Sequence, residues 1–344
     1  LDGQLEGSVD LYRKTVEDLL FNPSLPATAG AAAPPTRNVA SMRNQGIDVS
    51  LRGQTSITNE LDIDVQANLT TYNNEITSIA PGIGFFDVGV VRNEVGHPIS
   101  SFFGYKVTGF WQNQEEIDQA NQQAPDGTYM DGMGVGRFRY KDVNGDNQIT
   151  ADDRTHLGSP HPDFSYGLNL NLTYRGFDFT AFLYGEQGRE LWNETKRGTD
   201  FRATFNTANS EVALYDSWTP ENRNAEAPIQ EQNAYFSTSN ANSSYFVENG
   251  SYLRLKSLRL GYTIPTSILQ QAGVSQAKLY VQAKNLFTIT PYGGLDPDIG
   301  ATQSAVNAAE GTGGRIQTGA TNFGVDRGGY PAMRAYRVGV NLSF

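Results

Sequence analysis

The sequence predicts an all-β chain whose amphipathic antiparallel strands belong to a large transmembrane β-barrel. Three observations carry this prediction: apolar and polar residues alternate along several segments, the last segment alternates up to a terminal aromatic residue, and short connections alternate with long ones. In such a barrel one face of each strand contacts lipid and the other faces a polar lumen, so the average hydropathy resembles that of a soluble protein. The mean hydropathy of −0.46 agrees with this.

Composition excludes several other classes of protein. The 344 residues carry a formal net charge of −11, and phosphate binding needs a basic face, so no nucleic acid partner is expected. The chain has no cysteine, which excludes a disulfide scaffold and a cysteine nucleophile. No apolar run reaches the ~18 residues of a transmembrane helix. We expect the acidic side chains on lumen faces and in loops, where they favour solubility.

The clearest strands show a strict period of two. Residues 61–69 place leucine, isoleucine and valine on one face and two aspartates on the other, which needs water on that side. In residues 164–174 the apolar face begins and ends with aromatic residues, as at the two interfaces of a membrane. Other segments with alternating or apolar character are 5–11, 47–51, 102–110, 177–183, 258–264 and 279–289.

Local irregularities are also readable. Arg175 and Gly176 predict a two-residue hairpin turn, because glycine adopts positive φ without strain. The apolar phase slips between Leu255 and Leu258, which predicts a β-bulge near Ser257.

The last segment alternates up to the final residue. Tyr336, Val338 and Leu342 share one face with Phe344, and polar residues fill the other. This ending resembles the last strand of a bacterial outer-membrane barrel, which implies that Tyr336 and Phe344 act as a membrane-insertion signal. An edge strand of a soluble sandwich is the alternative.

Connection lengths support the barrel. Short connections are predicted at 53–60, 175–176 and 265–276, and long ones at 112–163, 188–250 and 291–333. Barrels have short turns on the periplasmic rim and long loops outside. We count about ten strands, or eight if residues 83–110 contribute none. An even number of strands places the start of the first strand and the end of the last strand at the same end of the barrel.

Several motifs then resemble one family. Segments 38–48, 141–146, 158–170, 249–255 and 284–288 follow, in order, motifs of SusC/RagA-type TonB-dependent outer-membrane transporters. Ala40 departs from the glycine that this family favours, and Asn147 departs from the glycine of the calcium-loop pattern. The resemblance implies that residues 1–344 form the C-terminal barrel segment of a TonB-dependent receptor with twenty-two strands. The plug domain and the N-terminal strands have no counterpart in this sequence.

The resemblance also implies a function. Such receptors import a nutrient, here an oligosaccharide or a peptide, across the bacterial outer membrane. They act with a SusD-like surface lipoprotein and take energy from the TonB complex through the plug. The expected surroundings are outer-membrane lipid, with no covalent chemistry. The alternative is a soluble, calcium-stabilised β-sandwich that binds or cleaves glycans.

One loop has the spacing of an EF-hand-type calcium site. Oxygen ligands are expected at positions 1, 3, 5, 7, 9 and 12 of such a loop, with position 7 using its backbone carbonyl. The corresponding residues are Asp142, Asn144, Asp146, Gln148, Thr150 and Asp153. Calcium here would brace the long loop. A solvated turn without metal remains the alternative.

No catalytic residues are predicted. His97, His156 and His161 lack the spacing of a zinc site and are expected in surface loops. Trp111 and Trp192 are expected in the interfacial aromatic belt. Trp218, deep in a long loop, is a weak candidate for substrate binding, because indole faces stack on sugar rings.

Overall fold

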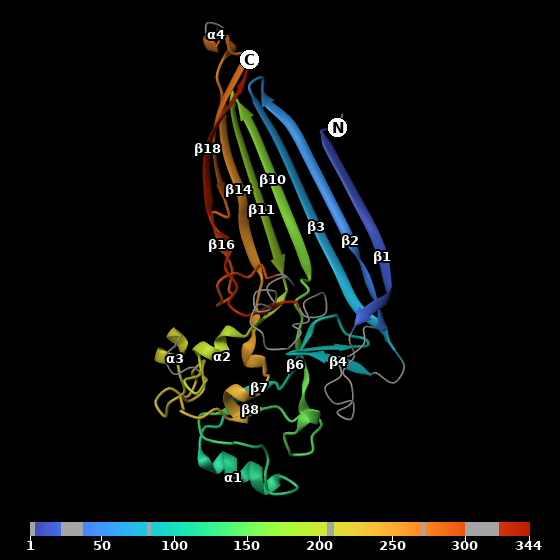
Figure 1. The fold of residues 1–344 in the computed structure, drawn as a ribbon, viewed down its shortest axis with the longest axis vertical. Coiled ribbons are helices and arrows are strands. Elements are labelled where there is room, and N and C mark those ends of the chain that lie inside the picture. The colour runs from blue at the N-terminus through green and yellow to red at the C-terminus, as the bar shows by residue number, and fades with distance from the viewer. Residues whose placement is uncertain (1–3, 22–36, 81–83, 205–209, 270–272, 300–322) are drawn as a thin grey trace.

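The computed structural model describes residues 4–21, 37–80, 84–204, 210–269, 273–299 and 323–344. Its main feature is an antiparallel sheet in which eight long strands follow one another in chain order (Figure 1). They are β1 (Leu5–Phe21), β2 (Arg37–Thr58), β3 (Leu61–Ile79), β10 (Phe164–Tyr174), β11 (Phe177–Gln187), β14 (Tyr252–Thr263), β15 (Gln276–Lys284) and β18 (Ala335–Ser343). The short β16 (Thr288–Ile289) also pairs with β14.

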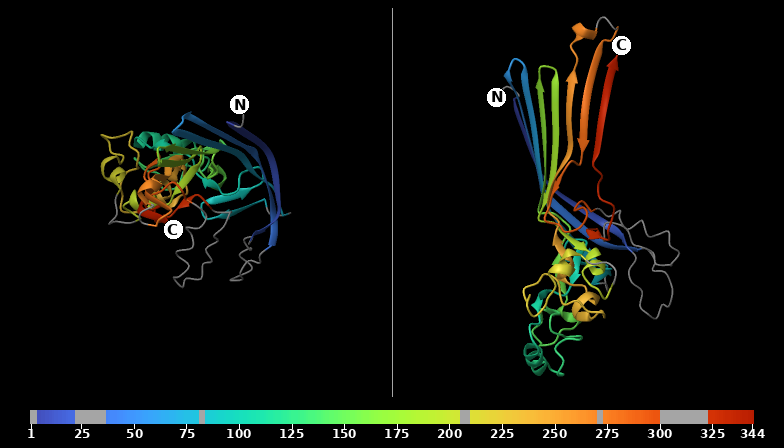
Figure 2. Two further views of the ribbon diagram at one scale, coloured as in Figure 1. Left: turned by 90° about the horizontal axis from the view of Figure 1, so that it is seen from above. Right: turned by 90° about the vertical axis from the view of Figure 1, so that its left-hand side faces the viewer.

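The two ends of this sheet differ, as predicted. The β2–β3, β10–β11 and β14–β15 connections lie at one end, where β1 begins and β18 ends (Figure 1). Arg175 and Gly176 have φ values of 47° and 82°, which fits the predicted two-residue turn with both central residues at positive φ. The three long connections lie at the opposite end and form a folded body that we call the rim (Figure 2).

Strand register aligns the apolar residues into rows across the sheet. One row consists of Ile63, Leu172, Phe179, Leu260, Val281 and Val338. This face is open: Leu260, Val281 and Val338 are 45%, 48% and 84% exposed. Leu168 and Val340 are exposed as well, and neither belongs to a buried cluster of the described residues. The face is therefore an apolar surface, and no second sheet of the described residues packs against it, as a lipid-facing wall requires.

The apolar face has a limited height. On β3 it runs from Leu61 to Leu69 and then gives way to Thr71, Asn73 and Glu75 on the same face. A tilted strand crosses a bilayer in about 9–11 residues. β2 has 22 residues, which corresponds to roughly 70 Å at ~3.3 Å per residue. β1 to β3 thus continue well beyond the apolar band and carry the rim.

The rim contains short elements of its own. They are β4 (Phe85–Val88), β5 (Val91–Glu94), β6 (Ser101–Gly104), β7 (Val107–Phe110), α1 (Gln114–Gln123), β8 (Phe138–Tyr140), β9 (Thr155–Gly158), β12 (Glu190–Asn193), α2 (Thr195–Thr199), α3 (Glu211–Tyr215), β13 (Val247–Asn249) and β17 (Val325–Asp326). α4 (Thr266–Leu269) lies instead in the β14–β15 connection. Fully buried aromatic residues of the first two long connections, including Phe102, Phe138, Trp192 and Phe246, form one core. Val325 of the third connection packs against it.

Some strand predictions need correction. Residues 102–110 form β6 and β7 in two small rim sheets, so the lower count of eight long strands applies among the described residues. The predicted strand 279–289 breaks at Asn285, whose φ is 50°. The predicted bulge is present, because Phe182 pairs with Ser257 and Leu183 with Leu255.

Helices play a small part in the architecture. Among the described residues, no helix is long and apolar enough to cross a bilayer.

The two faces of β10 predict opposite responses to a charge. We expect Leu170→Arg to lower the free energy of unfolding of the complete barrel in lipid vesicles by about 2–4 kcal/mol, because it puts a guanidinium in hydrocarbon. Asn171→Arg is the matched control, since residue 171 pairs with Asp64 on the polar face. Urea titrations of both variants check this, and an equal effect of the two would contradict the assignment of faces.

Candidate functional site

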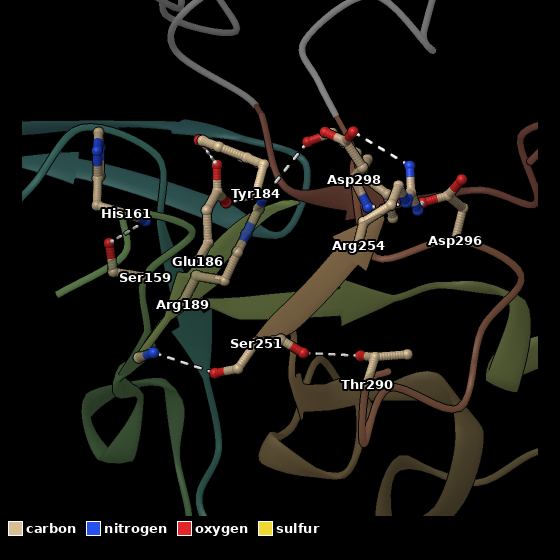
Figure 3. Close-up of polar contacts among 12 residues, drawn as sticks. Ser159, His161, Tyr184, Glu186, Arg189, Ser251, Arg254, Thr290, Asp296 and Asp298 are labelled. Carbon is tan, nitrogen blue, oxygen red and sulfur yellow. Dashed lines mark hydrogen bonds and ion pairs between the residues drawn. The ribbon is translucent and has the colours of Figure 1, made fainter. Parts of the chain in front are cut away.

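A polar network lies where β11 and β14 leave the apolar band and residues 288–299 cross their polar face (Figure 3). Ser251 helps to hold this crossing. Its hydroxyl accepts a hydrogen bond from the Gly188 amide at 3.0 Å, and its carbonyl accepts one from the Thr290 hydroxyl at 2.8 Å. The network is therefore built from two strands and one loop.

Arg254 is the centre of this network. Its side chain is 3% exposed and donates to Asp296, to Asp298 at 3.3 Å and to Thr288 at 2.8 Å (Figure 3). Burial alone would raise the pKa of Asp296, but the amides of Ala332 and Asp298 and the guanidinium of Arg254 lower it overall. The carboxylate is thus held charged, and it ties the last long loop to β14.

A second ion pair lies beside the first. Glu186 accepts hydrogen bonds from Arg189 at 2.5 Å and from the Tyr184 hydroxyl at 2.9 Å. The Arg189 guanidinium is almost completely buried and also donates to the carbonyl of Ile299. Its Nε has no acceptor in the described part of the chain. Together the two arginines fix the same loop at two points.

His161 occupies the edge of a polar groove between β2, β3 and the rim. Tyr12, Tyr72 and Glu190 also line this groove. The hydroxyl of Tyr72 lies 3.1 Å from Nδ1 and the carbonyl of Ile99 lies 3.0 Å from Nε2 of His161. Burial lowers the pKa of His161 to about 4. The imidazole is therefore neutral, with Nε2–H donating and Nδ1 accepting.

The histidine predictions are partly wrong. His161 is half-buried with both ring nitrogens in contact with protein groups, and His97 and His156 stack on each other with ring centroids 3.6 Å apart. His156 lies in β9 and contacts Glu94 at 3.3 Å. These positions are structural contacts within the rim rather than exposed loop sites.

The predicted calcium loop is ordered by its own backbone. The carboxylate of Asp142 accepts hydrogen bonds from the amides of Gly145 and Asn147, and Asp146 accepts one from the amide of Gln148. Asn147 has φ of 61°, the left-handed conformation for which glycine is usual at this position. The chain therefore turns here without the glycine of the calcium-loop pattern, because asparagine tolerates this conformation.

The end of this loop is buried. Asp153 is completely buried and accepts hydrogen bonds from the amides of Val143 and Thr150, both at 2.8 Å. Among the described residues, no three His, Asp or Glu side chains are grouped as a metal cluster. The carboxylates of Asp142, Asp146 and Asp153 each accept hydrogen bonds from amides of this loop. Asn144, Gln148 and Thr150 are the other residues of the predicted set.

The tryptophan predictions are corrected by burial. Trp111 and Trp192 are 4% and 0% exposed and belong to the rim core, so they are not in the interfacial belt. Trp218 is 4% exposed, and its ring lies so close to Gly136 that a Cβ there would come within 2.4 Å of it, while Nε1 donates to Gln112 at 3.3 Å. Its ring is thus covered by protein in this structure, and it offers no open face to a sugar.

The predicted insertion signal lies at the open edge of the sheet. Tyr336 is on β18 and is 70% exposed, and Phe344 follows this strand and is 88% exposed. Both are on the apolar face. Arg254, Arg189 and Asp296 were not predicted as site residues, because nothing in their local sequence signals that a distant loop pairs with them.

The burial of His161 predicts a pH response of the rim. Its pKa of about 4 is below the ~6.5 of a free histidine, so the opened state takes up a proton first as pH falls. We expect the contact to be fully stable above pH 6.5 and to lose on the order of 3 kcal/mol by pH 4. Hydrogen exchange of the Ile99 amide measures this. His161→Gln should remove that part of the dependence, and identical profiles would contradict the assignment.

The chain is similar to several known receptors, although no protein-family profile matches it. TonB-dependent receptor P26 of Formosa agariphila is 32% identical over the whole chain, and receptor P3 of the same organism is 29% identical; the chain covers 33% of each. TonB-dependent receptor SusC of Bacteroides thetaiotaomicron is 26% identical over the whole chain, which covers 30% of it. These relatives are named as receptors and not as enzymes.

A solved structure agrees in fold. The RagAB peptide transporter superposes with a TM-score of 0.75 and 24% identity over 100% of this chain and 34% of that one. The chain thus spans about a third of the length of its relatives. The predicted barrel fold and outer-membrane location are confirmed. Over its whole length the chain is similar to about a third of these TonB-dependent receptors, SusC among them.

Proposed function

We propose that the complete protein imports a nutrient across the outer membrane in a TonB-dependent manner, and that this chain supplies a wall of its barrel and part of its outer rim. An oligosaccharide is the proposed substrate class, and a peptide is the alternative. Similarity over the whole chain to SusC supports the first, and similarity to a structure titled as a peptide transporter supports the second.

The single observation that carries this proposal is the two-faced sheet with open edges. Its outer face is apolar over one membrane thickness, and β1 and β18 each pair with only one strand among those described. Unpaired backbone groups are not tolerated in hydrocarbon. The sheet therefore requires further strands to close it, as the chain's share of its relatives implies.

Partners and assembly belong to the same proposal. A SusD-like surface lipoprotein is the proposed partner at the rim, and the TonB complex acts through a plug domain outside these residues. We also propose Tyr336 and Phe344 as the insertion signal. Their exposed aromatic rings on the terminal strand support this role.

A calcium ion is proposed as a brace of the rim. Asp142, Asn144 and Asp146 with Gln148, Thr150 and Asp153 are the proposed ligands. The left-handed Asn147 and the run of amides turned towards Asp142 and Asp146 support it, because this backbone path wraps oxygens around one position in calcium loops.

The import proposal predicts energy-dependent uptake. Cells that express the full-length receptor should accumulate fluorescent maltohexaose, tetragalacturonate or a labelled tryptic peptide mixture more than a deletion strain does. Accumulation should fall to the deletion level when the gene for TonB is removed, because the barrel supplies no energy itself. Equal uptake with and without TonB would contradict the proposal, as would no difference for any of the three probes.

The calcium proposal predicts a titration result. Calorimetry on chelator-treated full-length protein should detect calcium binding, and Asp142→Asn should weaken it at least about tenfold through loss of a charged ligand. Asp152→Asn is the matched control, because its carboxylate is outside the proposed set. It should change affinity less than about twofold. Absence of binding to the wild type at millimolar calcium would contradict the proposal.

A further inference from the structure

The last three long strands carry an unusual charge pattern. β14, β15 and β18 contain six basic residues and no acidic one, although the whole chain has 37 acidic residues against 26 basic ones. The six are Arg254, Lys256, Arg259, Lys278, Lys284 and Arg337. By contrast, β1, β2 and β3 carry most of the strand aspartates and glutamates.

These cations lie on the lumen side of the sheet. Arg259 is flanked in sequence by Leu258 and Leu260, and Arg337 by Tyr336 and Val338, which belong to the apolar face. Because successive side chains of a strand alternate between faces, the cations point to the opposite side. The lumen wall of the described sheet is therefore purely basic over β14, β15 and β18, whereas β1 to β3 carry eight acidic and five basic residues.

Half of the six cations already have carboxylate partners. Asp298 and Asp296 from the last long loop bind Arg254, and Asp298 also binds Lys256 at 2.7 Å. Asp178 on β11 binds Lys278 at 2.7 Å. Carboxylates of the protein itself therefore already bind these cations at two places along the strands, one at Arg254 and Lys256 and the other at Lys278.

The other three have none. Arg259, Lys284 and Arg337 make no ion pair in the described part of the chain, and the buried Nε of Arg259 has no acceptor. They are neighbours in the register: Arg259 and Arg337 both pair with Gln282, and Lys284 lies two residues further along β15. We call these three residues the free basic patch.

Packing holds one residue of the patch, Arg259, in place, while Lys284 and Arg337 are exposed. The Arg259 guanidinium lies 4.5 Å from the centre of the Tyr280 ring, a cation–π contact. Tyr280 in turn lies flat across β18, where a Cβ at Gly339 would come within 2.4 Å of its ring. A glycine at this position lets the ring and the arginine lie along the wall. The Arg259 guanidinium is therefore preorganised for an incoming anion.

We propose that the free basic patch binds carboxylate-bearing solutes in the lumen, so that the imported nutrient is anionic. This inference rests on the proposed import function and names its substrate class. The carboxylates can come from an acidic sugar or from acidic side chains of a peptide, and arginine pairs with both through charge-assisted hydrogen bonds. Such pairs weaken as salt rises, because part of the surface is solvent-accessible.

The test uses the full-length receptor in detergent. Fluorescence anisotropy would measure binding of tetragalacturonate, its carboxyl-reduced neutral analogue and a tetraglutamate peptide at 50 and 300 mM NaCl, pH 7.5. We expect at least one anionic probe to bind about tenfold more tightly than the neutral analogue, and this preference to shrink at high salt. Preference for the sugar or for the peptide identifies the source of the carboxylate.

Charge variants locate the site. Arg259→Gln combined with Arg337→Gln should remove the preference for the anionic probe. Lys14→Gln combined with Arg52→Gln removes the same charge from β1 and β2 and should change it less than about twofold. The wild-type comparison of charged and neutral probes needs no variant, so it stands even if the double variant assembles poorly.

Two results would overturn the inference: equal binding of the neutral and both anionic probes by the wild type, or equal loss in both double variants. TonB-dependent uptake of maltohexaose together with either result would leave the import function intact and remove only the anionic substrate class. Anion binding without any TonB-dependent uptake would instead contradict the import function.

Discussion

The structure depends on one constraint: in hydrocarbon, every backbone amide and carbonyl must find a partner within the protein. Adjacent long strands satisfy it through continuous antiparallel pairing, from Leu5 opposite Gly53 to Gln276 opposite Ser343. The same constraint makes the described sheet incomplete by itself, because β1 and β18 present unpaired edges. It also explains why irregular backbone gathers in the rim, where water and side chains serve as partners.

Sequence patterns predicted the parts of the fold that depend on neighbours along the chain. The alternation of residues 164–174, the turn at Arg175 and Gly176, and the slip near Ser257 are local, so they were readable. The rim was not. Trp111 and Trp192 look like interfacial residues in sequence, but they are buried because segments far apart in the chain fold over them. Burial of this kind has no local signal.

The same limit applies to the candidate site. Asp142 and Asn147 belong to a loop whose spacing identifies it, and the predicted turn geometry is present. Arg254 and Asp296 are 42 residues apart, and only the folded loop brings them together. The prediction that acidic residues fill the lumen faces holds for β3, but the lumen face of β14 is basic. The net charge of the whole chain does not show that the lumen faces of β3 and β14 differ in the sign of their charge.

The shared aromatic core of the rim has an evolutionary consequence. Phe138 comes from the long connection between β3 and β10, whereas Trp192 and Phe246 come from the one between β11 and β14, yet all three belong to one buried cluster. Such a receptor cannot change its outer surface by exchanging one long connection for that of a relative. The exchanged segment would leave a cavity in the core that the connections share. The outer surface must then diversify through substitutions of exposed residues around an unchanged core, or through replacement of all the long connections together.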